Sequence, residues 1–329
     1  MKVNMGVELG AKLIQAAIIN KDGRLLARDK APANLEDGLE AMVKDAAKLI
    51  NALLEDEELD MRSVKSIGVA VPGIVDEEGS CVLKAHVMNW RNAPIQQEFE
   101  KLFDVPIHVE NDAHCAAIAE STCGAAENLE HSMTINIGTG ISGGIMIHNR
   151  LYTGYANAGA VIGHMVIDRH GKECYCGQRG CFEALCSAKA LIDTTREIAE
   201  RNLDSKIHQV CGNDLSQITV KTLWEAGNLG DAEAKEAFGE YVENFAVALS
   251  NFANVLMPEA IVICGGITGL GEDLLRPVRE KVFAAIYSKD IATLPLIKQS
   301  EMGSAAVLVG AGMVSTPTTA ELGWQGWRR

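Results

Sequence analysis

The chain has 329 residues, of which 47% are hydrophobic and 31 are glycine, and its formal net charge is −14. This composition is that of a globular α/β protein and excludes a disordered or fibrous one, and the length predicts two domains. The negative charge argues against nucleic-acid binding, which needs basic patches. No signal peptide and no apolar run long enough to span a bilayer are recognised, and nine cysteines in so long a chain do not suggest a disulfide scaffold. A cytoplasmic protein is expected.

The first part of the chain alternates short apolar runs with helical patterns. Strands are predicted at 3–9, 13–20, 24–30, 66–71 and 107–109. Helices are predicted at about 35–55, 94–103 and 113–123. The helix at 35–55 has apolar residues at helical spacing, and Asn34 can cap it. Pro72-Gly73 stops the strand at 66–71.

The second part repeats this alternation. Strands are predicted at 133–137, 145–147 and 261–264. Helices are predicted at about 184–202, 220–225, 232–256, 270–286 and 304–314, and 315–329 is predicted to be a tail. Strands that alternate with helices predict parallel or mixed sheets flanked by helices, with ligands at the carboxyl ends of the strands. The two strand-rich openings, at Val3 and at Met133, predict two similar lobes with a cleft between them.

The most specific pattern lies between Gly163 and Glu183. It holds His164, Cys174, Cys176 and Cys181 in the spacing H-x9-C-x-C-x4-C. Three thiolates and one imidazole suit tetrahedral zinc, and a set without an open position indicates a structural site. The alternative is that the cysteines are small buried hydrophobes. The glycine-rich, polar surroundings of the three cysteines favour zinc, because they read as a loop and not as an apolar face.

Glycine runs follow two predicted strands. Gly138–Gly144, with the hydroxyls of Thr139 and Ser142, and Gly265-Gly266 are both placed where backbone N–H groups can surround phosphate oxygens. Each signal is weak alone, because such turns are common without a ligand. Asp112 lies at a strand-to-helix junction after Asn111, and it could be a cleft carboxylate or only the cap of the following helix. The local sequence leaves both readings open.

Together these residues resemble the ROK family (repressors, open reading frames and sugar kinases) of the actin-like ATPase fold. The matching segments run in order along nearly the whole chain, and the cysteine segment is the most specific. They are the hairpin at 6–19, Val71-Pro72-Gly73, Glu110-Asn111-Asp112-Ala113, Ile137-Gly138-Thr139-Gly140, Ile162-Gly163-His164-Met165, the cysteine segment through Glu183, and Ile263-Cys264-Gly265-Gly266-Ile267. The resemblance implies a two-lobed, ribonuclease H-like α/β fold with mixed sheets flanked by helices and a cleft between the lobes.

The resemblance also implies roles for single residues. Asp112 would be the general base that takes a proton from a sugar hydroxyl as it attacks the γ-phosphate of ATP, which agrees with the needs of phosphoryl transfer. The sugar would be held by Asn111, His164 and Glu183. The nucleotide and its Mg²⁺ would be held by Glu8, Gly10, Lys12, Gly138, Thr139, Gly140, Gly265 and Gly266. His164 would also bind the structural zinc.

The family pattern divides the chain as follows. Residues 1–119 would form an N-terminal lobe, against which a helix at about 303–315 packs back, and residues 120–302 would form a C-terminal lobe that carries the zinc loop 163–183. Residues 316–329 would be a tail. A homodimer is implied by the habit of the family. No DNA-binding helix-turn-helix is recognised before the first strand, which favours the kinase branch over the repressor branch.

Three segments depart from the family pattern. The first phosphate loop reads Glu8-Leu9-Gly10-Ala11-Lys12-Leu13 where the family has Asp-x-Gly-Gly-Thr-Lys. Val161 stands where an acidic residue precedes the histidine, and His86-Val87-Met88-Asn89-Trp90 replaces Asn-Leu-x-Gly-Trp. Two functions therefore stay open: a kinase of a hexose or an N-acyl amino sugar, and a catalytically weak relative that senses a sugar or nucleotide. A catalytic-zinc hydrolase is disfavoured, since four protein ligands leave the metal no open site.

Overall fold

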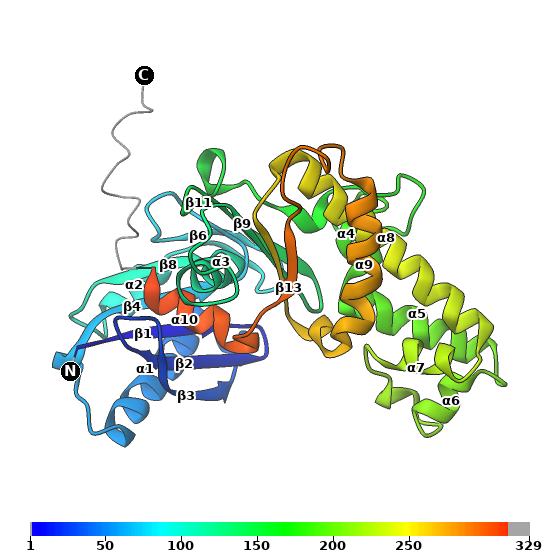
Figure 1. The fold of residues 1–329 in the computed structure, drawn as a ribbon. Helices are drawn as coiled ribbons and strands as arrows, with labels where there is room; N and C mark the ends of the chain where they lie inside the picture. The colour runs from blue at the N-terminus through cyan, green and yellow to red at the C-terminus, as the bar shows by residue number, and fades with distance from the viewer. Residues whose placement is uncertain (1, 315–329) are drawn as a thin grey trace. The chain divides into compact units, whose positions relative to one another are not determined.

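The structure, a computed structural model, describes residues 2–314. The predicted tail at 316–329 lies outside the described residues. The contacts between residues divide the chain into two units (Figure 1). The first unit comprises residues up to 134, residues 143–160 and residues from 301 on, and the second comprises residues 135–142 and 161–300. Each unit is described by itself below.

The first sheet belongs to the first unit, and its middle strands are mostly apolar and almost wholly buried. Its strand order is β3 (Leu25–Pro32), β2 (Leu13–Ile19), β1 (Val3–Leu9), β4 (Val64–Val71) and β8 (Ile107–Asn111). β1 pairs antiparallel with β2 and parallel with β4, and β4 pairs parallel with β8. Continuous apolar runs of this kind are expected when both faces of a sheet are covered. Helix α1 (Gly38–Asp56) packs on one face, and α3 (Asp112–Cys123) and α10 (Ala306–Met313) pack on the other.

Helix α10 lies so close to the first sheet and to α3 that glycine is required at each of these contacts (Figure 1). A Cβ atom on Gly6 of β1 would lie 1.9 Å from the carbonyl oxygen of Leu308, and one on Gly68 of β4 would lie 1.7 Å from that of Ala311. A Cβ atom on Gly310 of α10 would lie 1.7 Å from the carbonyl oxygen of Cys115 in α3. The last described helix is therefore an integral part of the core that the first strands begin.

A small second sheet in the first unit was not predicted. Its order is β5 (Ile74–Val75), β6 (Val82–Ala85) and β7 (Trp90–Ala93), and it is followed by the short helix α2 (Ile95–Glu100). These strands are two to four residues long and their middle positions are exposed. Such runs are too short to show an alternating pattern in the sequence.

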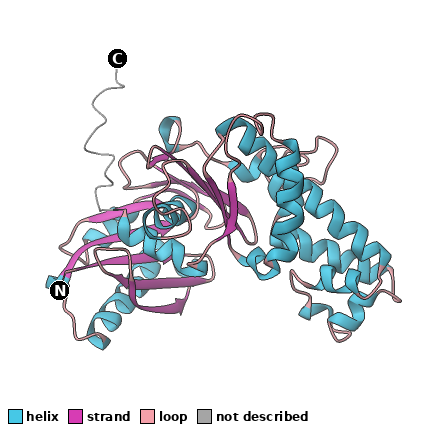
Figure 2. Ribbon diagram, in the orientation of Figure 1, coloured by secondary structure: helices cyan, strands magenta, loops and turns pink. Residues whose placement is uncertain are grey.

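A third sheet has the strand order β11 (Arg150–Tyr152), β10 (Ile141–Ile147), β9 (Ser132–Ile137), β12 (Ala260–Cys264) and β13 (Leu296–Gln299). The remaining helices all belong to the second unit, where Figure 2 shows them packed against one another. They are α4 (Phe182–Cys186), α5 (Ala188–Arg201), α6 (Lys206–Val210), α7 (Thr222–Asn228), α8 (Ala232–Leu256) and α9 (Glu272–Ala285). Phe182 of α4 packs between Phe245 and Phe252 of α8, with ring centroids 5.7 and 6.1 Å away.

Three predicted elements differ from the structure for local reasons. The helix predicted at 184–202 is broken at Ser187, whose hydroxyl accepts a hydrogen bond from the Ala190 N–H and so begins a new helix. The helix predicted at 35–55 opens with a 3-10 turn, and Asn34 caps that turn. The strand predicted at 145–147 begins at Ile141, so only Gly138, Thr139 and Gly140 of the predicted glycine loop lie outside a strand.

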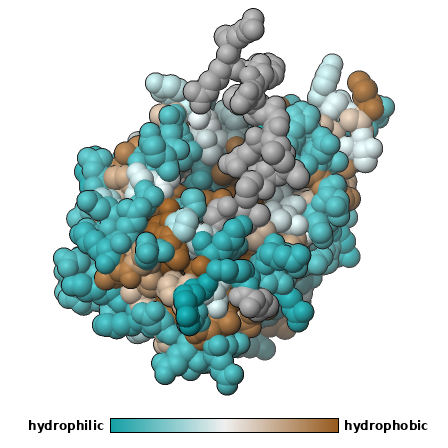
Figure 3. Space-filling view, turned by 90° about the vertical axis from the view of Figure 1, so that its left-hand side faces the viewer, coloured by the Kyte–Doolittle hydropathy of each residue, from teal (hydrophilic) through white to brown (hydrophobic). Residues whose placement is uncertain are grey.

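Figure 3 shows one face of the molecule, on which hydrophilic side chains surround small apolar patches. Among the helices of the described residues, none is both long enough and apolar enough to cross a membrane.

Candidate active site

Asp112 is the first residue of α3, directly after strand β8. The cap of this helix is Asn111, whose Oδ1 accepts hydrogen bonds from the N–H groups of Ala113 (2.9 Å) and His114 (3.1 Å). The Oδ1 of Asp112 accepts a hydrogen bond from the Ala113 N–H at 2.8 Å. Because Asn111 already fills the capping position, capping alone does not account for a carboxylate at position 112.

The amide of Asn111 is held at both ends. Its Nδ2 donates to the carbonyl oxygen of Gly73 at 2.9 Å, while its Oδ1 caps α3. Gly73 has a φ of +107°, and a Cβ atom there would lie 2.3 Å from the Lys84 carbonyl oxygen, so the Val71-Pro72-Gly73 turn needs glycine. The Asn111 side chain also donates a hydrogen bond to the Asp112 carboxylate, which opposes the rise in the pKa of Asp112.

A second pair fixes the same junction, and sequence reasoning missed it. The Nδ1 of His114 lies 2.9 Å from Oε1 of Glu110, and the same oxygen accepts the N–H of Asn111 at 2.8 Å. His114 is buried in α3. In the sequence, this pair could have been found from its spacing: a carboxylate and an imidazole stand four residues apart across the start of the helix. Side chains at this spacing lie close together on a helix. The pair restrains Asn111 and hence the direction in which Asp112 leaves the strand.

Glu8 lies in electrostatic range of Asp112 within the first unit. In the β1–β2 hairpin Glu8 is directly opposite Gln15, whose Nε2 donates to Oε2 of Glu8 at 2.7 Å. Burial, and then the negative charge of Asp112, raise the pKa of Glu8 to about 7. Burial also raises the pKa of Asp112, to about 6, against the opposing effect of the Ala113 hydrogen bond. Two partly buried carboxylates with raised pKa values indicate a functional site.

The predicted phosphate residues near Glu8 lie in the tight β1–β2 turn. The N–H of Gly10 donates to the carbonyl oxygen of Leu13 at 2.9 Å, which closes the turn. A Cβ atom on Gly10 would lie 2.9 Å from that same oxygen. Lys12 is exposed, so its ammonium group can reach a ligand at the turn.

Replacing Glu8 by glutamine is expected to stabilise the protein at alkaline pH. The raised pKa means that the folded state binds this proton more tightly than the unfolded state, so the contribution of Glu8 to stability falls as pH rises from about 4.5 through about 7. Glutamine does not ionise, so Glu8→Gln should raise the free energy of unfolding by up to about 3 kcal/mol at pH 8 and by much less at pH 5. Urea unfolding of both proteins at the two pH values measures the difference. An equal stability difference at pH 5 and pH 8 would contradict the assignment.

The short loop after β9 in the second unit contains the predicted phosphate residues Gly138, Thr139 and Gly140. The N–H of Gly138 donates to the carbonyl oxygen of Gly140 at 2.9 Å, and the Gly138 carbonyl oxygen accepts the N–H of Ala188 at 2.9 Å. The side chain of Thr139 is exposed. The loop is therefore fixed by the start of α5 and presents one hydroxyl outward.

Glu183 is tied to this loop. It is buried, and its Oε2 accepts the N–H of Ile141 at 2.7 Å. A Cβ atom on Gly140 would lie 2.5 Å from the same oxygen, so glycine is needed for the loop to meet the carboxylate. The other carboxylate oxygen of Glu183, Oε1, does not accept this hydrogen bond from the loop. In the predicted sugar-binding role, Oε1 would accept the hydrogen bond of a sugar hydroxyl.

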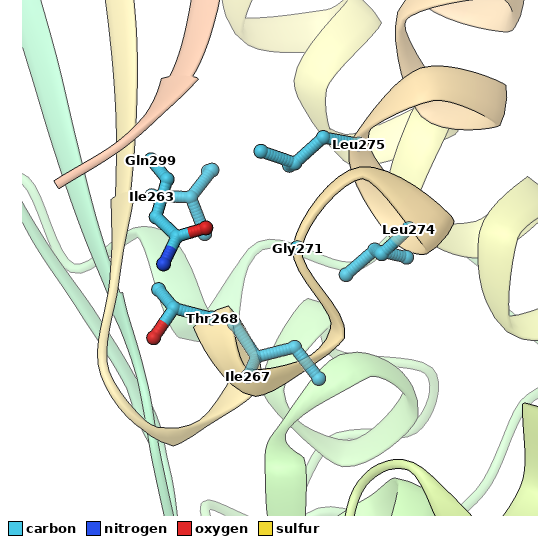
Figure 4. A pocket seen from close by; sticks show the side chains of 7 residues that line it. All are labelled: Ile263, Ile267, Thr268, Gly271, Leu274, Leu275 and Gln299. Carbon is cyan, nitrogen blue, oxygen red and sulfur yellow. The ribbon is translucent and has the colours of Figure 1, made fainter.

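The second glycine pair follows β12. Gly265 has a φ of +87°, and a Cβ atom there would lie 2.4 Å from the carbonyl oxygen of Ile137. Around Gly266 a Cβ atom would meet nothing within 4 Å, so this backbone is open to a ligand. A cavity of about 10 Å³ lies beside the pair (Figure 4). It is lined by Ile263, Ile267, Thr268, Gly271, Leu274, Leu275 and Gln299. That volume holds about one water molecule, so the cavity itself is not a nucleotide pocket.

The four predicted zinc ligands come together in the second unit. The ligand atoms of His164, Cys174, Cys176 and Cys181 all lie within 4.8 Å of one another. The Sγ of Cys174 is 3.6 Å from Nδ1 of His164, and the Sγ atoms of Cys176 and Cys181 are 3.6 Å apart. Zinc with ordinary bond lengths and tetrahedral angles separates such atoms by about 3.5–3.8 Å. The donor set therefore fits a structural zinc ion.

His164 connects this cluster to a tyrosine that sequence reasoning missed. Its Nδ1 faces Cys174, and its Nε2 lies 3.1 Å from the hydroxyl of Tyr175, with the two rings edge to face. Burial, and then the negative charge of Glu183, raise the pKa of Tyr175 to about 12. The phenol thus sits near both residues to which the sugar was assigned, His164 and Glu183. Val161 precedes the 3-10 turn that carries His164 and is 54% exposed.

Comparison with known proteins gives consistent results. The profile of the ROK family matches residues 4–316. The chain is 30% identical to a glucokinase of Thermotoga maritima, over 94% of this chain and 96% of that one. It is 24% identical to a xylose repressor of Caldicellulosiruptor bescii, over 96% of this chain and 80% of the repressor. A ROK family glucokinase from Streptomyces griseus, solved with glucose and AMPPNP, superposes with a TM-score of 0.81 at 28% identity, over 94% of this chain and 98% of that chain.

Proposed function

The chain belongs to the ROK family, and from this premise we propose that it is a sugar kinase that transfers a phosphoryl group from ATP to a hydroxyl of a hexose or an N-acyl amino sugar. The observation that carries the proposal is the placement of Asp112 at the β8–α3 junction, with the capping role taken by Asn111. The similarity to glucokinases, one of them solved with glucose and an ATP analogue, supports the choice of substrates.

The proposed chemistry in the first unit centres on Asp112. A sugar hydroxyl that attacks a phosphorus atom must lose its proton, and a carboxylate with a pKa of about 6 is ionised and still basic enough at neutral pH to accept it. Asn111 would hold a neighbouring sugar oxygen. Glu8 and Asp112 offer the carboxylate oxygens that Mg²⁺ prefers, and a cation would offset the negative charge of Asp112 that helps to raise the pKa of Glu8. Bound Mg²⁺ would neutralise phosphate charge.

The proposed roles in the second unit are positioning roles. Thr139 and the glycines beside it would contact phosphate oxygens, and the open backbone at Gly266 would lie against the nucleoside. Glu183 holds the phosphate loop through Ile141 and would accept a sugar hydrogen bond with its other oxygen. His164, Cys174, Cys176 and Cys181 would hold zinc, whose contribution is to fix the loop that carries Tyr175 and the ring of His164.

A second candidate function is a sugar-binding or nucleotide-binding regulator without turnover. It is favoured by the similarity to a xylose repressor and by the departures at Ala11, Lys12 and Val161 from the kinase pattern. Sugar-dependent ADP release, measured over glucose, mannose, N-acetylglucosamine and N-acetylmannosamine, separates the two functions. A kinase consumes ATP with at least one sugar. Sugar binding by calorimetry without ADP release would support the regulator.

The identity of the sugar is expected to depend on Val161. An apolar side chain beside His164 cannot accept a hydrogen bond, so plain glucose is expected to be a poorer substrate than a sugar with an acylated substituent. An apolar pocket discriminates by only about 1–3 kcal/mol, whereas a hydrogen-bonding site discriminates more strongly. Val161→Glu should therefore shift the ratio of kcat/KM values toward glucose by about 10-fold or more. Val161→Thr, of similar size, is the control. Wild-type protein that prefers glucose over every amino sugar would contradict this role.

A further inference from the structure

A second group of metal-ligating side chains lies in the first unit, outside the proposed active site. It consists of Glu130, His131 and His148, whose ligand atoms all lie within 4.8 Å of one another. Glu130 and His131 precede strand β9, and His148 lies in the turn between β10 and β11. Neither the ROK resemblance nor the kinase chemistry gives these three residues a role.

The backbone holds the three side chains together. The N–H of Asn149 donates to the carbonyl oxygen of Glu130 at 2.9 Å, which joins the hairpin turn to the segment before β9. His148 and Asn149 have φ values of +52° and +58°, as in the two-residue turns that match the twist of a hairpin. Since both connections are short and the hairpin register is fixed, the imidazole of His148 is carried by a rigid element.

The distances between the donor atoms suit a first-row transition metal. The Nδ1 of His148 lies 3.2 Å from Oε2 of Glu130, and the rings of His131 and His148 meet edge to face with centroids 4.4 Å apart. Nitrogen and oxygen ligands at zinc, about 2.0–2.2 Å from the metal, are separated by about 2.9–3.5 Å. A cation would exchange the His148–Glu130 hydrogen bond for a bond to each of the two side chains.

We propose that Glu130, His131 and His148 form a second metal site, which binds a divalent first-row transition cation such as Zn²⁺ or Ni²⁺. Two imidazoles and one carboxylate are ligands that these cations accept, and Mg²⁺ and Ca²⁺ prefer all-oxygen sets. Glu130 and His148 are exposed, so water completes the coordination and the ion exchanges freely. The site differs from the zinc cluster of the second unit, which is rich in thiolates and has no open position.

Metal binding at this site is expected to stabilise the first unit. The cation links the turn between β10 and β11 to the segment that enters β9, and it binds only when the fold brings these segments together. A ligand of the folded state alone raises the apparent stability as its concentration exceeds the dissociation constant. The proposal does not depend on the proposed function, because binding and stability are measured without any substrate.

The test is calorimetric titration of Ni²⁺ into the full chain after its tightly bound zinc has been measured by elemental analysis. The wild type should bind one further ion per chain and unfold at a higher temperature with it. His148→Ala should weaken this binding by about 10-fold or more. Even the replacement of a residue that only hydrogen-bonds to a metal ligand typically lowers metal affinity by about 10–100-fold. Glu130→Gln, which keeps the size of the side chain, should weaken it as well. The zinc that remains bound after dialysis, which belongs to the cysteine cluster, should not change in either variant.

His86→Ala is the matched control, because it removes an exposed histidine of the first unit outside the group. It should bind Ni²⁺ as the wild type does. Electron paramagnetic resonance of bound Cu²⁺ gives a second measurement, since coupling to two imidazole nitrogens should fall to one in His148→Ala. A wild-type protein that takes up no further ion would overturn the proposal. Undiminished binding by His148→Ala with coupling to two nitrogens would overturn it too.

Discussion

Replacing Asp112 by asparagine is expected to lower sugar-dependent ADP release by about 10²–10⁴-fold, the usual contribution of a general base, while sugar and ATP still bind. The variant keeps the size of the side chain and the hydrogen bond from the Ala113 N–H. The helix cap is unaffected, because Asn111 provides it. Turnover and sugar affinity, measured on the same two proteins, separate loss of chemistry from loss of binding.

Asp214→Asn is the matched control for this experiment. Asp214 is an exposed aspartate that caps a 3-10 turn of the second unit by accepting the N–H of Ser216. Asparagine caps about as well as aspartate, so this variant should keep full activity and stability. If Asp112 were no more than part of the helix start, Asp112→Asn would behave in the same way. Full activity of the Asp112→Asn variant would therefore contradict the proposed general-base role of Asp112.

The pH dependence of the reaction provides an independent measure of the same residue. Burial raises the pKa of Asp112 to about 6, and only the ionised form can accept a proton. The wild-type kcat/KM should fall about tenfold per pH unit below about 6, and the residual activity of Asp112→Asn should lack that limb. An identical acidic limb in both proteins would assign the titration to another group, with Glu8 as the nearest alternative.

The second large effect is expected from Cys176→Ser, which should remove zinc and destabilise the second unit. Cys176 is exposed and contributes one of four donors, and serine keeps its size without the thiolate. Metal binding and folding are coupled at such sites, where zinc supplies about 10–16 kcal/mol in isolated zinc-finger peptides. Elemental analysis should find about one zinc per wild-type chain and far less in the variant, and the melting temperature should fall with it.

Cys81→Ser is the control, because Cys81 is a half-buried cysteine outside the cluster. It should keep its zinc and its melting temperature. Treating the wild type with a strong chelator should reproduce the instability of Cys176→Ser, and added zinc should restore the wild type but not the variant. The structural zinc proposal fails if freshly purified wild-type protein contains no zinc.

Much of the fold could be predicted because its pattern is local. The recognised family and the fold class are confirmed by the family profile and by the similarity to the Streptomyces griseus glucokinase. Strand β1 and helix α8 lie where their apolar patterns predict them, at 3–9 and 232–256. Strands β6 and β13 were missed, since each has four residues with a partly exposed pattern and owes its existence to its neighbours in the sheet.

The candidate site was predictable in its residue types but less so in their partners. Glu8 and Gln15 are seven residues apart, and they meet only because the hairpin register places them opposite each other. The sequence could not tell which of Asn111 and Asp112 caps α3, because both residue types cap well. Tyr175 reaches His164 through the folded shape of the cysteine loop, which no periodic pattern describes.

The position of α10 has a consequence for biosynthesis. Residues 306–313 cover Gly6 of β1 and Gly68 of β4, so the apolar face begun by the first strands stays uncovered until nearly the whole chain has left the ribosome. At a synthesis rate of about 5–20 residues per second, that delay is on the order of 15–60 s. During this time the nascent first unit exposes a surface that chaperones recognise. A released fragment that ends just before Ala306 should therefore remain protease-sensitive in its first unit, whereas a released chain that extends through Met313 should be resistant.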